Sequence, residues 1–254
     1  MEPNSDLFSG KFSNYSKYRP GYPQSLLRLM EEHINLTPVT VVADIGSGTG
    51  ICSRLFIENG NTVYGVEPND EMRQYSATLF RAYPGFHSLK GTGEETGLHD
   101  NSVDLVVCAQ SFHWLNPDSA KVEFQRILSD QGHVALIWND KAQEENSFNS
   151  DYESICERFK SFRPKYNSGG KSLIDRSVLD NFFKGSYKTM ELENHQDLTL
   201  EGVMGRYSST SYAIGPEEAE YESLVTEMKE AFEKYQNNGL VRIKYVTRIF
   251  LGSV

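Results

Sequence analysis

The chain has 254 residues, 38% of them hydrophobic, with a net charge of −10 at pH 7 and a pI of about 5.1. This length suits one large α/β domain that buries its core without disulfides or structural metals. The acidic balance lacks the surplus of Lys and Arg that nucleic-acid binding requires, and no apolar run approaches the roughly 20 residues that span a bilayer. Three cysteines without metal-binding spacing favour a reducing compartment, so we expect a cytoplasmic protein without metal, membrane or nucleic-acid partners.

A polar leader with several aromatic residues opens the chain. Residues 1–23 contain Tyr15, Tyr18-Arg19-Pro20 and Tyr22-Pro23, and the prolines keep the end of this segment irregular. Apolar residues then recur at helical spacing over 24–35. We therefore expect 1–35 to form a leader followed by one helix.

The run VTVVADIGSGTG over 39–50 combines a strand pattern with a glycine-rich turn. Its apolar, β-branched part carries Asp44 and ends at Ile45, before Gly46-Ser47-Gly48-Thr49-Gly50 and a helix through Ile57. Such a turn places backbone N–H groups and the positive end of a helix dipole beside a ligand. The glycines alternate, unlike G-x-G-x-x-G, whose third glycine lies six places along. The alternative is a tight turn without a ligand.

A second strand is predicted in NTVYGVEP, residues 61–68. It ends at Glu67, which lies 67 − 44 = 23 residues after Asp44, about one strand–helix–strand unit. An acidic residue at this place in a nucleotide-binding α/β fold accepts hydrogen bonds from both ribose hydroxyls. The alternative is a solvated acid at the end of a strand. We expect Asp70 to cap the next helix, 70–82.

The middle of the chain predicts three more strands. They cover 86–90, the continuous apolar run 103–109 and 133–138. Pro117 suits the first turn of a helix that continues to Leu128 and ends in a turn over 129–132.

The character of the chain changes after Asn139. Residues 141–185 mix charged and aromatic residues around an Asn-Ser-Gly-Gly loop at 167–170. We interpret them as a helical insertion that covers the ligand site as a lid; the alternative is an ordinary pair of surface helices. A strand over 186–198, helices over 200–213 and 216–237, and a closing strand over 241–250 follow. No linker marks a second domain, so 1–254 is predicted to be one domain.

D-x-G-x-G-x-G, from Asp44 to Gly50, resembles motif I of the class I S-adenosylmethionine-dependent methyltransferases. The leader pattern Y..YRP.YP and the segment Phe112-His113-Trp114 resemble the small-molecule, type 11 branch of this family, which includes trans-aconitate methyltransferase-like proteins. The resemblance covers residues 12–140 well and the rest loosely. It implies a Rossmann-like, seven-stranded, mostly parallel sheet with helices on both faces and an antiparallel last strand.

The resemblance also implies S-adenosylmethionine as cofactor and gives roles to particular residues. The glycine turn would hold the methionine part, Glu67 the ribose, and Gly93 with Glu94 the adenine, although Thr92 stands where the family usually has Asp. Arg19 would pair with the methionyl carboxylate, and Tyr18 would close over the cofactor. The implied cofactor contacts are Tyr18, Arg19, Asp44, Gly46, Ser47, Gly48, Glu67, Pro68, Gly93, Glu94 and Gln110.

The acceptor site is predicted directly after the strand 103–109, because parallel α/β sheets bind ligands at the carboxyl ends of their strands. The candidates are Gln110, Ser111, Phe112, His113 and Trp114. As the candidate catalytic residues, His113 would act as a base or a hydrogen-bond donor and Trp114 as an apolar wall. The alternatives are a structural histidine bonded to a backbone carbonyl and a core tryptophan. Asp140 and Lys141 are weaker candidates.

The predicted function is methyl transfer to a small-molecule acceptor, with a carboxylate oxygen favoured. The motifs of amino-methylating and cytosine-methylating nucleic-acid enzymes are absent, and Cys108 lies in an apolar strand where it would pack as a small hydrophobic residue. One alternative is a non-catalytic S-adenosylmethionine-binding module or regulatory subunit. A nicotinamide-dependent oxidoreductase is another, against which the alternate glycines weigh. The sequence does not predict the oligomeric state.

Overall fold

The computed structural model describes residues 16–160 and 175–254, which divide into two compact units. The sheet unit comprises 21–139, 175–192 and 247–254, and the helical unit comprises 16–20, 140–160 and 193–246. Tyr15 and the loop 167–170 lie outside the described residues.

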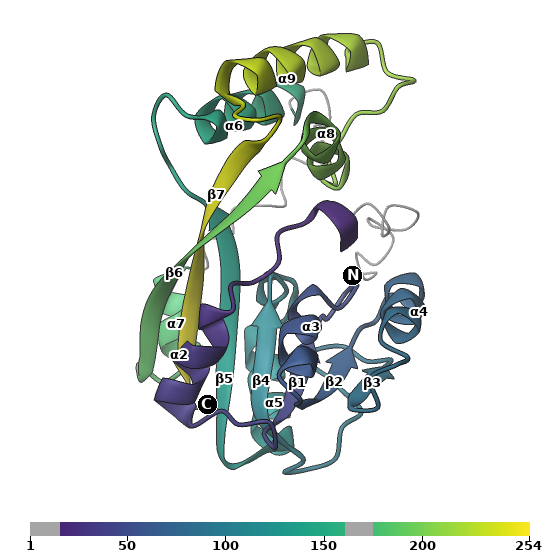
Figure 1. Cartoon of the computed structure of the whole chain (residues 1–254). Coiled ribbons are helices and arrows are strands. Elements are labelled where there is room, and N and C mark those ends of the chain that lie inside the picture. The colour runs from purple at the N-terminus through teal and green to yellow at the C-terminus, as the bar shows by residue number, and fades with distance from the viewer. Residues whose placement is uncertain (1–15, 161–174) are drawn as a thin grey trace. The chain divides into compact units, whose positions relative to one another are not determined.

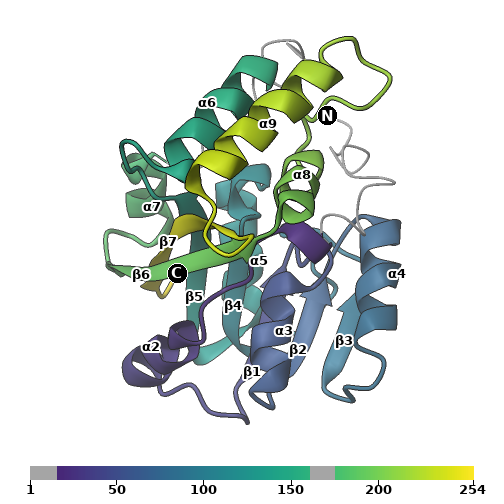
Figure 2. The ribbon, with the colours of Figure 1, turned by 45° about the horizontal axis from the view of Figure 1, so that its top comes forward.

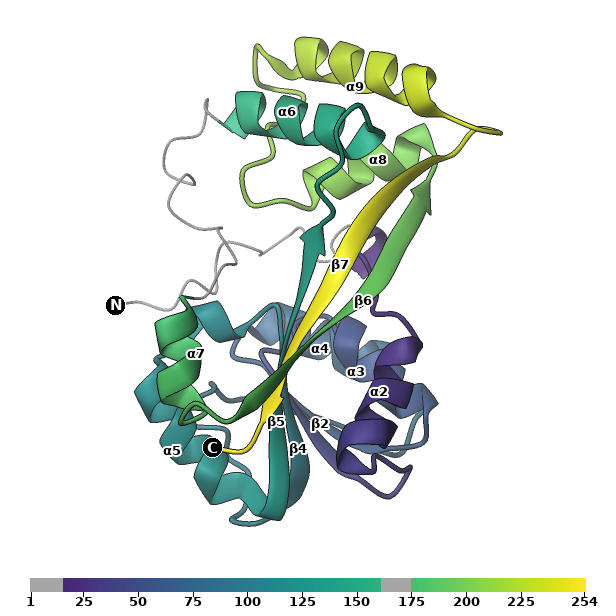
Figure 3. The same ribbon diagram turned by 90° about the vertical axis from the view of Figure 1, so that its left-hand side faces the viewer.

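A seven-stranded sheet, ordered β3-β2-β1-β4-β5-β7-β6, forms the centre of the sheet unit (Figure 1). The pairs β3–β2, β2–β1, β1–β4 and β4–β5 are parallel, and β7 runs against β5 and β6 (Figure 3). The predicted mostly parallel sheet with an antiparallel last strand is thus confirmed. The strands are β1 Val41–Ile45, β2 Thr62–Val66, β3 Phe86–Leu89, β4 Val103–Ala109, β5 Leu128–Lys141, β6 Tyr187–Leu198 and β7 Val241–Gly252.

Helices cover both faces of this sheet. In Figure 3, α5 and α7 lie on one face, and α2 and α3 lie on the other. Each face has its own apolar core, one containing Phe124 and Phe182 and the other containing Leu26 and Phe56. The helices of the sheet unit are α2 Ser25–Ile34, α3 Ile51–Glu58, α4 Asp70–Leu79, α5 Pro117–Ile127 and α7 Arg176–Phe182.

The helical unit has a separate core, formed by α6 Phe148–Lys160, α8 Leu200–Ser208 and α9 Tyr221–Tyr235. Helices α6 and α9 pack side by side (Figure 2). The ends of β5, β6 and β7 continue from the sheet unit into this unit.

Several predicted boundaries differ from the structure. Val39 is 86% exposed and precedes β1, because the chain turns at Pro38. The turn predicted over 129–132 is a bulge within β5: Val103 pairs with Leu128, and Leu105 already pairs with His133. The Ser, Asp, Gln and Gly residues that favour a turn also suit an irregular strand edge.

The predicted helical insertion 141–185 is not a single body. Its α6 packs in the core of the helical unit, whereas Leu179 and Phe182 of α7 pack with α5 in the sheet unit. The two helices predicted over 200–213 and 216–237 are shorter in the structure and form α8 and α9. A lid role for the insertion stays a prediction.

The chain first extends the sheet from β1 through β2 to β3, and then returns to add β4 on the other side of β1. The order of the strands therefore reverses between β1 and β4. Ligands of open α/β sheets bind at such a reversal, outside the carboxyl ends of the strands. The segments that leave β1 and β4 at this edge begin with Gly46 and Gln110, both of which the sequence assigns to the site.

Candidate functional site

The glycine loop, residues 46–50, follows β1 at the carboxyl edge of the sheet. Gly46, Gly48 and Gly50 all have positive φ, at +67°, +56° and +83°. Side chains rarely adopt this conformation, so the alternate glycines are explained by the backbone itself. A Cβ on Gly46 would lie 2.6 Å from Ser111 Cβ, and one on Gly50 would collide with Phe80. A Cβ on Gly48 would meet only Met72 Sδ, at 3.8 Å, so the Gly48 face of the loop stays open.

Three oxygen atoms around the glycine loop are buried without a hydrogen-bond partner among the described residues. They are Asp44 Oδ1, Ser47 Oγ and Thr49 Oγ1. The other oxygen of Asp44 accepts a hydrogen bond from Ser53 Oγ at 2.6 Å, and burial raises the pKa of Asp44 to about 6. Buried polar atoms are normally satisfied, and such groups gathered at one loop indicate a site for a polar ligand.

Glu67 immediately follows β2 and lies against this loop. Its Oε2 accepts the Gly48 N–H and its Oε1 accepts the Asn69 N–H, both at 2.8 Å. The side chain is buried, which raises the pKa of its carboxyl group, while these two hydrogen bonds and Arg73 act in the opposite direction. A carboxylate has about four lone-pair sites, so two remain for ribose hydroxyls. The ribose role of Glu67, with Pro68 beside it, stays a prediction.

The helix cap after β2 corrects the assignment of Asp70. Asn69 is the N-cap of α4, and its side-chain oxygen accepts the Met72 N–H at 2.9 Å. Asp70 is the first residue of the helix and pairs with Arg73 and Lys90. Both residue types suit an N-cap, and the backbone turn after Glu67 decides between them.

The predicted adenine contacts lie in the turn after β3. A Cβ on Gly93 would lie 2.5 Å from Leu115 Cδ1, so a larger residue there would require the Leu115 side chain to move. Glu94 Oε1 accepts the Asn116 N–H at 2.7 Å, which ties this turn to the start of α5. Leu115 and Met72, the apolar side chains nearest to Gly93 and Gly48, are neighbours that sequence reasoning missed. In the sequence, each of them is marked only as an apolar residue near a motif, which does not predict a contact with the site.

The segment after β4 separates into buried and exposed side chains. Gln110 has φ +60°, its N–H donates to Ile137 O at 2.9 Å, and its side chain donates to Asn139 O at 3.2 Å. Ser111 Oγ donates to Ile45 O at 2.5 Å, which holds the ends of β1 and β4 together. Phe112 is 1% exposed and packs edge-on against Phe182, so its side chain belongs to the core of the sheet unit, and its place in the acceptor site stays a prediction.

His113 and Trp114 face outward in the 3₁₀ turn Phe112–Trp114, with ring centroids 4.9 Å apart. Trp114 is 47% exposed, which contradicts the alternative of a core tryptophan. Neither ring nitrogen of His113 bonds to a backbone carbonyl within the described parts of the chain, so the alternative of a structural histidine is not supported either. His113 remains accessible, yet nearby protein atoms displace enough water to lower its pKa.

The leader residues lie in the helical unit, against α8. Tyr18 Oη donates to Glu201 Oε1 at 2.9 Å, and its ring packs on Gly205. Arg19 Nη2 donates to Ser209 O at 2.8 Å. The cofactor roles of Tyr18 and Arg19 stay predictions. Lys141, at the end of β5, pairs with Glu153 and lies over the Tyr152 ring; Asp140 precedes it.

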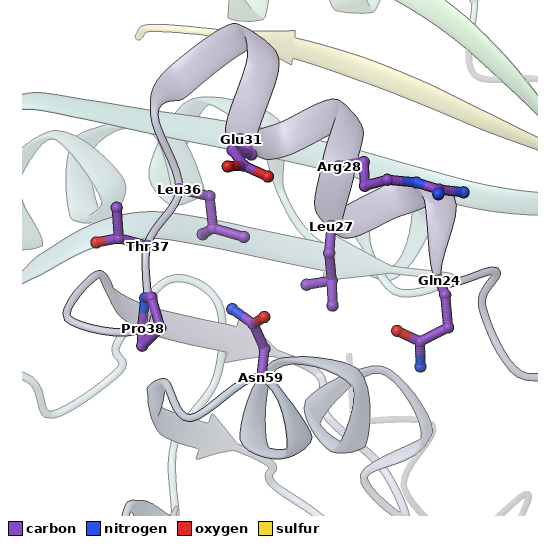
Figure 4. Close-up of a pocket in the computed structure, with 8 residues that line it drawn as sticks. All are labelled: Gln24, Leu27, Arg28, Glu31, Leu36, Thr37, Pro38 and Asn59. Carbon is purple, nitrogen blue, oxygen red and sulfur yellow. The ribbon is translucent and has the colours of Figure 1, made fainter.

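A separate pocket of about 440 Å³ lies between α2, the segment before β1 and the end of α3 (Figure 4). It is lined by Gln24, Leu27, Arg28, Glu31, Leu36, Thr37, Pro38 and Asn59. None of these residues belongs to the motifs above. The described residues hold no cluster of three or more His, Cys, Asp or Glu side chains placed to bind a metal ion. Among the described helices, none is long and apolar enough to cross a membrane.

Comparisons with known proteins agree on one family. Residues 43–136, which run from β1 into β5, match the methyltransferase domain. An uncharacterized methyltransferase of Mycobacterium tuberculosis is 36% identical over 136 residues, 53% of this chain and 52% of that protein. The chain thus spans about half the length of this relative. An uncharacterized methyltransferase-like protein of Schizosaccharomyces pombe is 24% identical over 250 residues, 96% of this chain and 93% of its own.

Solved structures share the whole fold. A protein from Anaeromyxobacter dehalogenans, described as a type II methyltransferase, covers 93% of this chain and 98% of its own length. Its TM-score is 0.67 at 18% identity, a likeness of fold alone. Together these comparisons show that residues 43–136 are similar to a methyltransferase domain and that the chain shares its fold with a solved methyltransferase structure.

Proposed function

We propose that this chain transfers the methyl group of S-adenosylmethionine to a small-molecule acceptor, with a carboxylate oxygen as the favoured target. The observation that carries the proposal is the glycine loop, whose open Gly48 face lies against the Glu67 carboxylate. The loop also has three buried oxygens without protein partners. These groups fit a ligand that has both hydroxyls and a polar chain.

The residues around the loop would divide the cofactor between them. Asp44, Ser47 and the backbone of the glycine loop would hold the methionine part, and Glu67 the ribose hydroxyls. Gly93 and Glu94 would flank the adenine beside Leu115. The bound cofactor supplies an activated sulfonium methyl group, so the protein has chiefly to position the acceptor and accept a proton where one is released.

His113 is the proposed base or anchoring group for the acceptor. A lowered pKa keeps its imidazole neutral near pH 7, and a neutral imidazole can accept a proton or donate one hydrogen bond. Trp114 would form an apolar wall with one N–H donor. A small acceptor also agrees with the net charge of −10, which disfavours nucleic-acid substrates.

Two measurements test this function. In a calorimetric titration, S-adenosylhomocysteine should bind and NAD should not; the reverse result would favour the oxidoreductase alternative. Labelled methyl donor should then methylate members of a panel of small acids, phenols and amines. Tight donor binding without any methylated acceptor would favour the non-catalytic binding module.

A further inference from the structure

A guanidinium group is buried in the helical unit without an acidic partner. Arg206 on α8 is 6% exposed. Its Nε donates to Tyr245 Oη at 3.3 Å, and its Nη1 donates to Ser209 Oγ at 3.5 Å. Both partners are neutral, and both hydrogen bonds are long. Within residues 16–160 and 175–254, no Asp or Glu pairs with this side chain.

The hydrogens of these neutral partners are already used elsewhere. Tyr245 Oη donates to Gln196 Oε1 at 2.9 Å, and Ser209 Oγ donates to the Arg206 carbonyl at 2.7 Å. Each hydroxyl therefore presents only lone pairs to Arg206. We call Arg206, Tyr152, Tyr245, Ser209 and Gln196 the Arg206 cluster.

An unpaired buried cation is costly, and this chain pairs other arginines well. Arg126 contacts Glu123 and Asp100, and Arg242 holds Asp197 through two hydrogen bonds of 2.7 Å. Those two side chains are 36% and 52% exposed, so water would solvate them even without partners. Arg206 is nearly buried and has no carboxylate partner, so most of the loss of its hydration is not offset.

A buried donor lies beside the same cation. Tyr152 Oη on α6 is buried and has no oxygen or nitrogen partner among the described residues, although the Cys156 thiol lies within range of a weak hydrogen bond. Arg206 and Cys156 are among the groups within electrostatic range of this hydroxyl, and a thiol is a weak acceptor. Burial raises the pKa of Tyr152, so its hydroxyl keeps its proton. A guanidinium with only neutral acceptors and a phenol donor without an oxygen or nitrogen acceptor form an incomplete set that one anion would complete.

The surrounding charges favour a single negative group. Arg19 Nη2 holds the carbonyl of Ser209, the residue whose hydroxyl contacts Arg206. Lys141 lies over the Tyr152 ring, although Glu153 neutralises it. A carboxylate carries one charge and two coplanar oxygens that match a guanidinium, whereas a phosphate dianion would need more than one cation.

We propose that Arg206 and Tyr152 bind the carboxylate group of a small organic acid. The guanidinium would pair with the carboxylate, and the Tyr152 hydroxyl would donate a further hydrogen bond to it. A neutral analogue of the same shape would leave the cation buried and unpaired, so the site would select for charge.

The test is calorimetric titration of the full chain with sodium benzoate and with benzamide, at constant ionic strength. Benzoate should bind at least about tenfold more tightly than benzamide, as expected for a hydrogen-bonded charge pair. Tyr152→Phe should weaken benzoate binding by about tenfold, because it removes one donor to a charged group. Arg206→Met should abolish binding, and Arg206→Lys should restore part of it.

Two matched variants control for nonspecific effects in the same unit. Tyr221→Phe removes a phenol hydroxyl from α9, and Arg158→Met removes an exposed guanidinium from α6; both should leave benzoate affinity unchanged. Far-ultraviolet circular dichroism should show that every variant is folded. Equal affinities for benzoate and benzamide, or undiminished benzoate binding by folded Arg206→Met and Tyr152→Phe, would overturn the proposal.

A parallel titration with S-adenosylhomocysteine separates this inference from the proposed function. All variants should keep wild-type affinity for it, because none alters the glycine loop. Arg206-dependent benzoate binding in a chain that does not bind S-adenosylhomocysteine would support the carboxylate site and reject the function. Binding of S-adenosylhomocysteine by a chain that binds benzoate no better than benzamide would support the cofactor of the proposed function and reject the carboxylate site.

Discussion

The glycine loop of the sheet unit and the Arg206 cluster of the helical unit both bury polar atoms that lack protein partners. The loop offers backbone conformation: three residues with positive φ, and carboxylate and hydroxyl oxygens around them. The Arg206 cluster offers side chains: one cation and one phenol donor. A site formed by the backbone should fail when a side chain is added. A site formed by side chains should lose its affinity for ligand when one side chain is removed. That removal can also raise the unfolding free energy of the ligand-free protein.

The largest expected effect comes from adding a side chain to the loop. Gly48→Val should weaken S-adenosylhomocysteine binding by more than about 100-fold, since the new side chain would occupy the open face that the ligand needs. Because valine is strained at positive φ, the variant should also have an unfolding free energy about 1–3 kcal/mol lower than that of the wild type. Gly185→Val is the matched control, with φ +75° and open space around it. It should cost similar stability and no affinity; equal loss of binding in both variants would reject the loop as the site.

The second prediction concerns Glu67, the hydrogen-bond acceptor that lies against the same loop. Glu67→Ala should weaken S-adenosylhomocysteine binding by about 1–3 kcal/mol, the usual loss for a hydrogen-bonded charged group. The measurement is again calorimetric, with Glu95→Ala as a control on an exposed acid in the same unit. An unchanged dissociation constant in Glu67→Ala would place the ribose contact elsewhere.

The two sites differ in how far the sequence predicts them. The glycine loop, Glu67 and the exact bounds of β4 follow from local patterns, because glycine spacing and strand periodicity act over a few residues. The choice of Asn69 over Asp70 as cap, and the bulge over 129–132, depend on backbone geometry that both patterns allow. Phe112 and Trp114 are both aromatic, and only packing against Phe182 buries one of them.

The Arg206 cluster has no comparable local signal. Its members come from α6, β6, α8 and β7, so residues separated by up to about ninety positions meet only in the fold. A single arginine on an amphipathic helix predicts a solvated charge. Only the packing of the helical unit shows that its guanidinium is buried and that its partners are neutral.

A third prediction compares two arginines by their effect on stability. Arg206→Met should leave the unfolding free energy of the ligand-free protein unchanged or higher, because it removes an unpaired buried charge. Arg126→Met should lower it by about 1–3 kcal/mol, since the mostly buried Glu123 carboxylate would lose its partner. Urea denaturation at low salt measures both. A strong loss in Arg206→Met would mean that the guanidinium is a structural element already satisfied by its neutral partners.

The smallest effect concerns Asp44, whose site should make stability depend on pH, whereas the Arg206 cluster should not. The pKa of Asp44 is raised to about 6 in the folded chain from an ordinary value of 3.8, so the folded state binds more protons between these values. Lowering the pH from 7 to 5 should therefore stabilise the fold through Asp44 by roughly 1 kcal/mol. Arg206 stays protonated throughout this range and should contribute no such slope.

The check for Asp44 is the difference in unfolding free energy between the wild type and Asp44→Asn, measured at several pH values. The asparagine keeps an oxygen that can accept from Ser53 but cannot titrate. Subtraction cancels the groups that do not interact with Asp44. The Glu67 carboxylate does interact with it, so the difference also includes the change in the Glu67 pKa that the variant causes. The unfolding free energy of the wild type should rise relative to that of the variant as the pH falls from 7 to 5. A difference that does not vary with pH would mean that the Asp44 carboxylate is solvated or paired in solution. Asp44 Oδ1 would then no longer count among the oxygens at the loop that await a ligand.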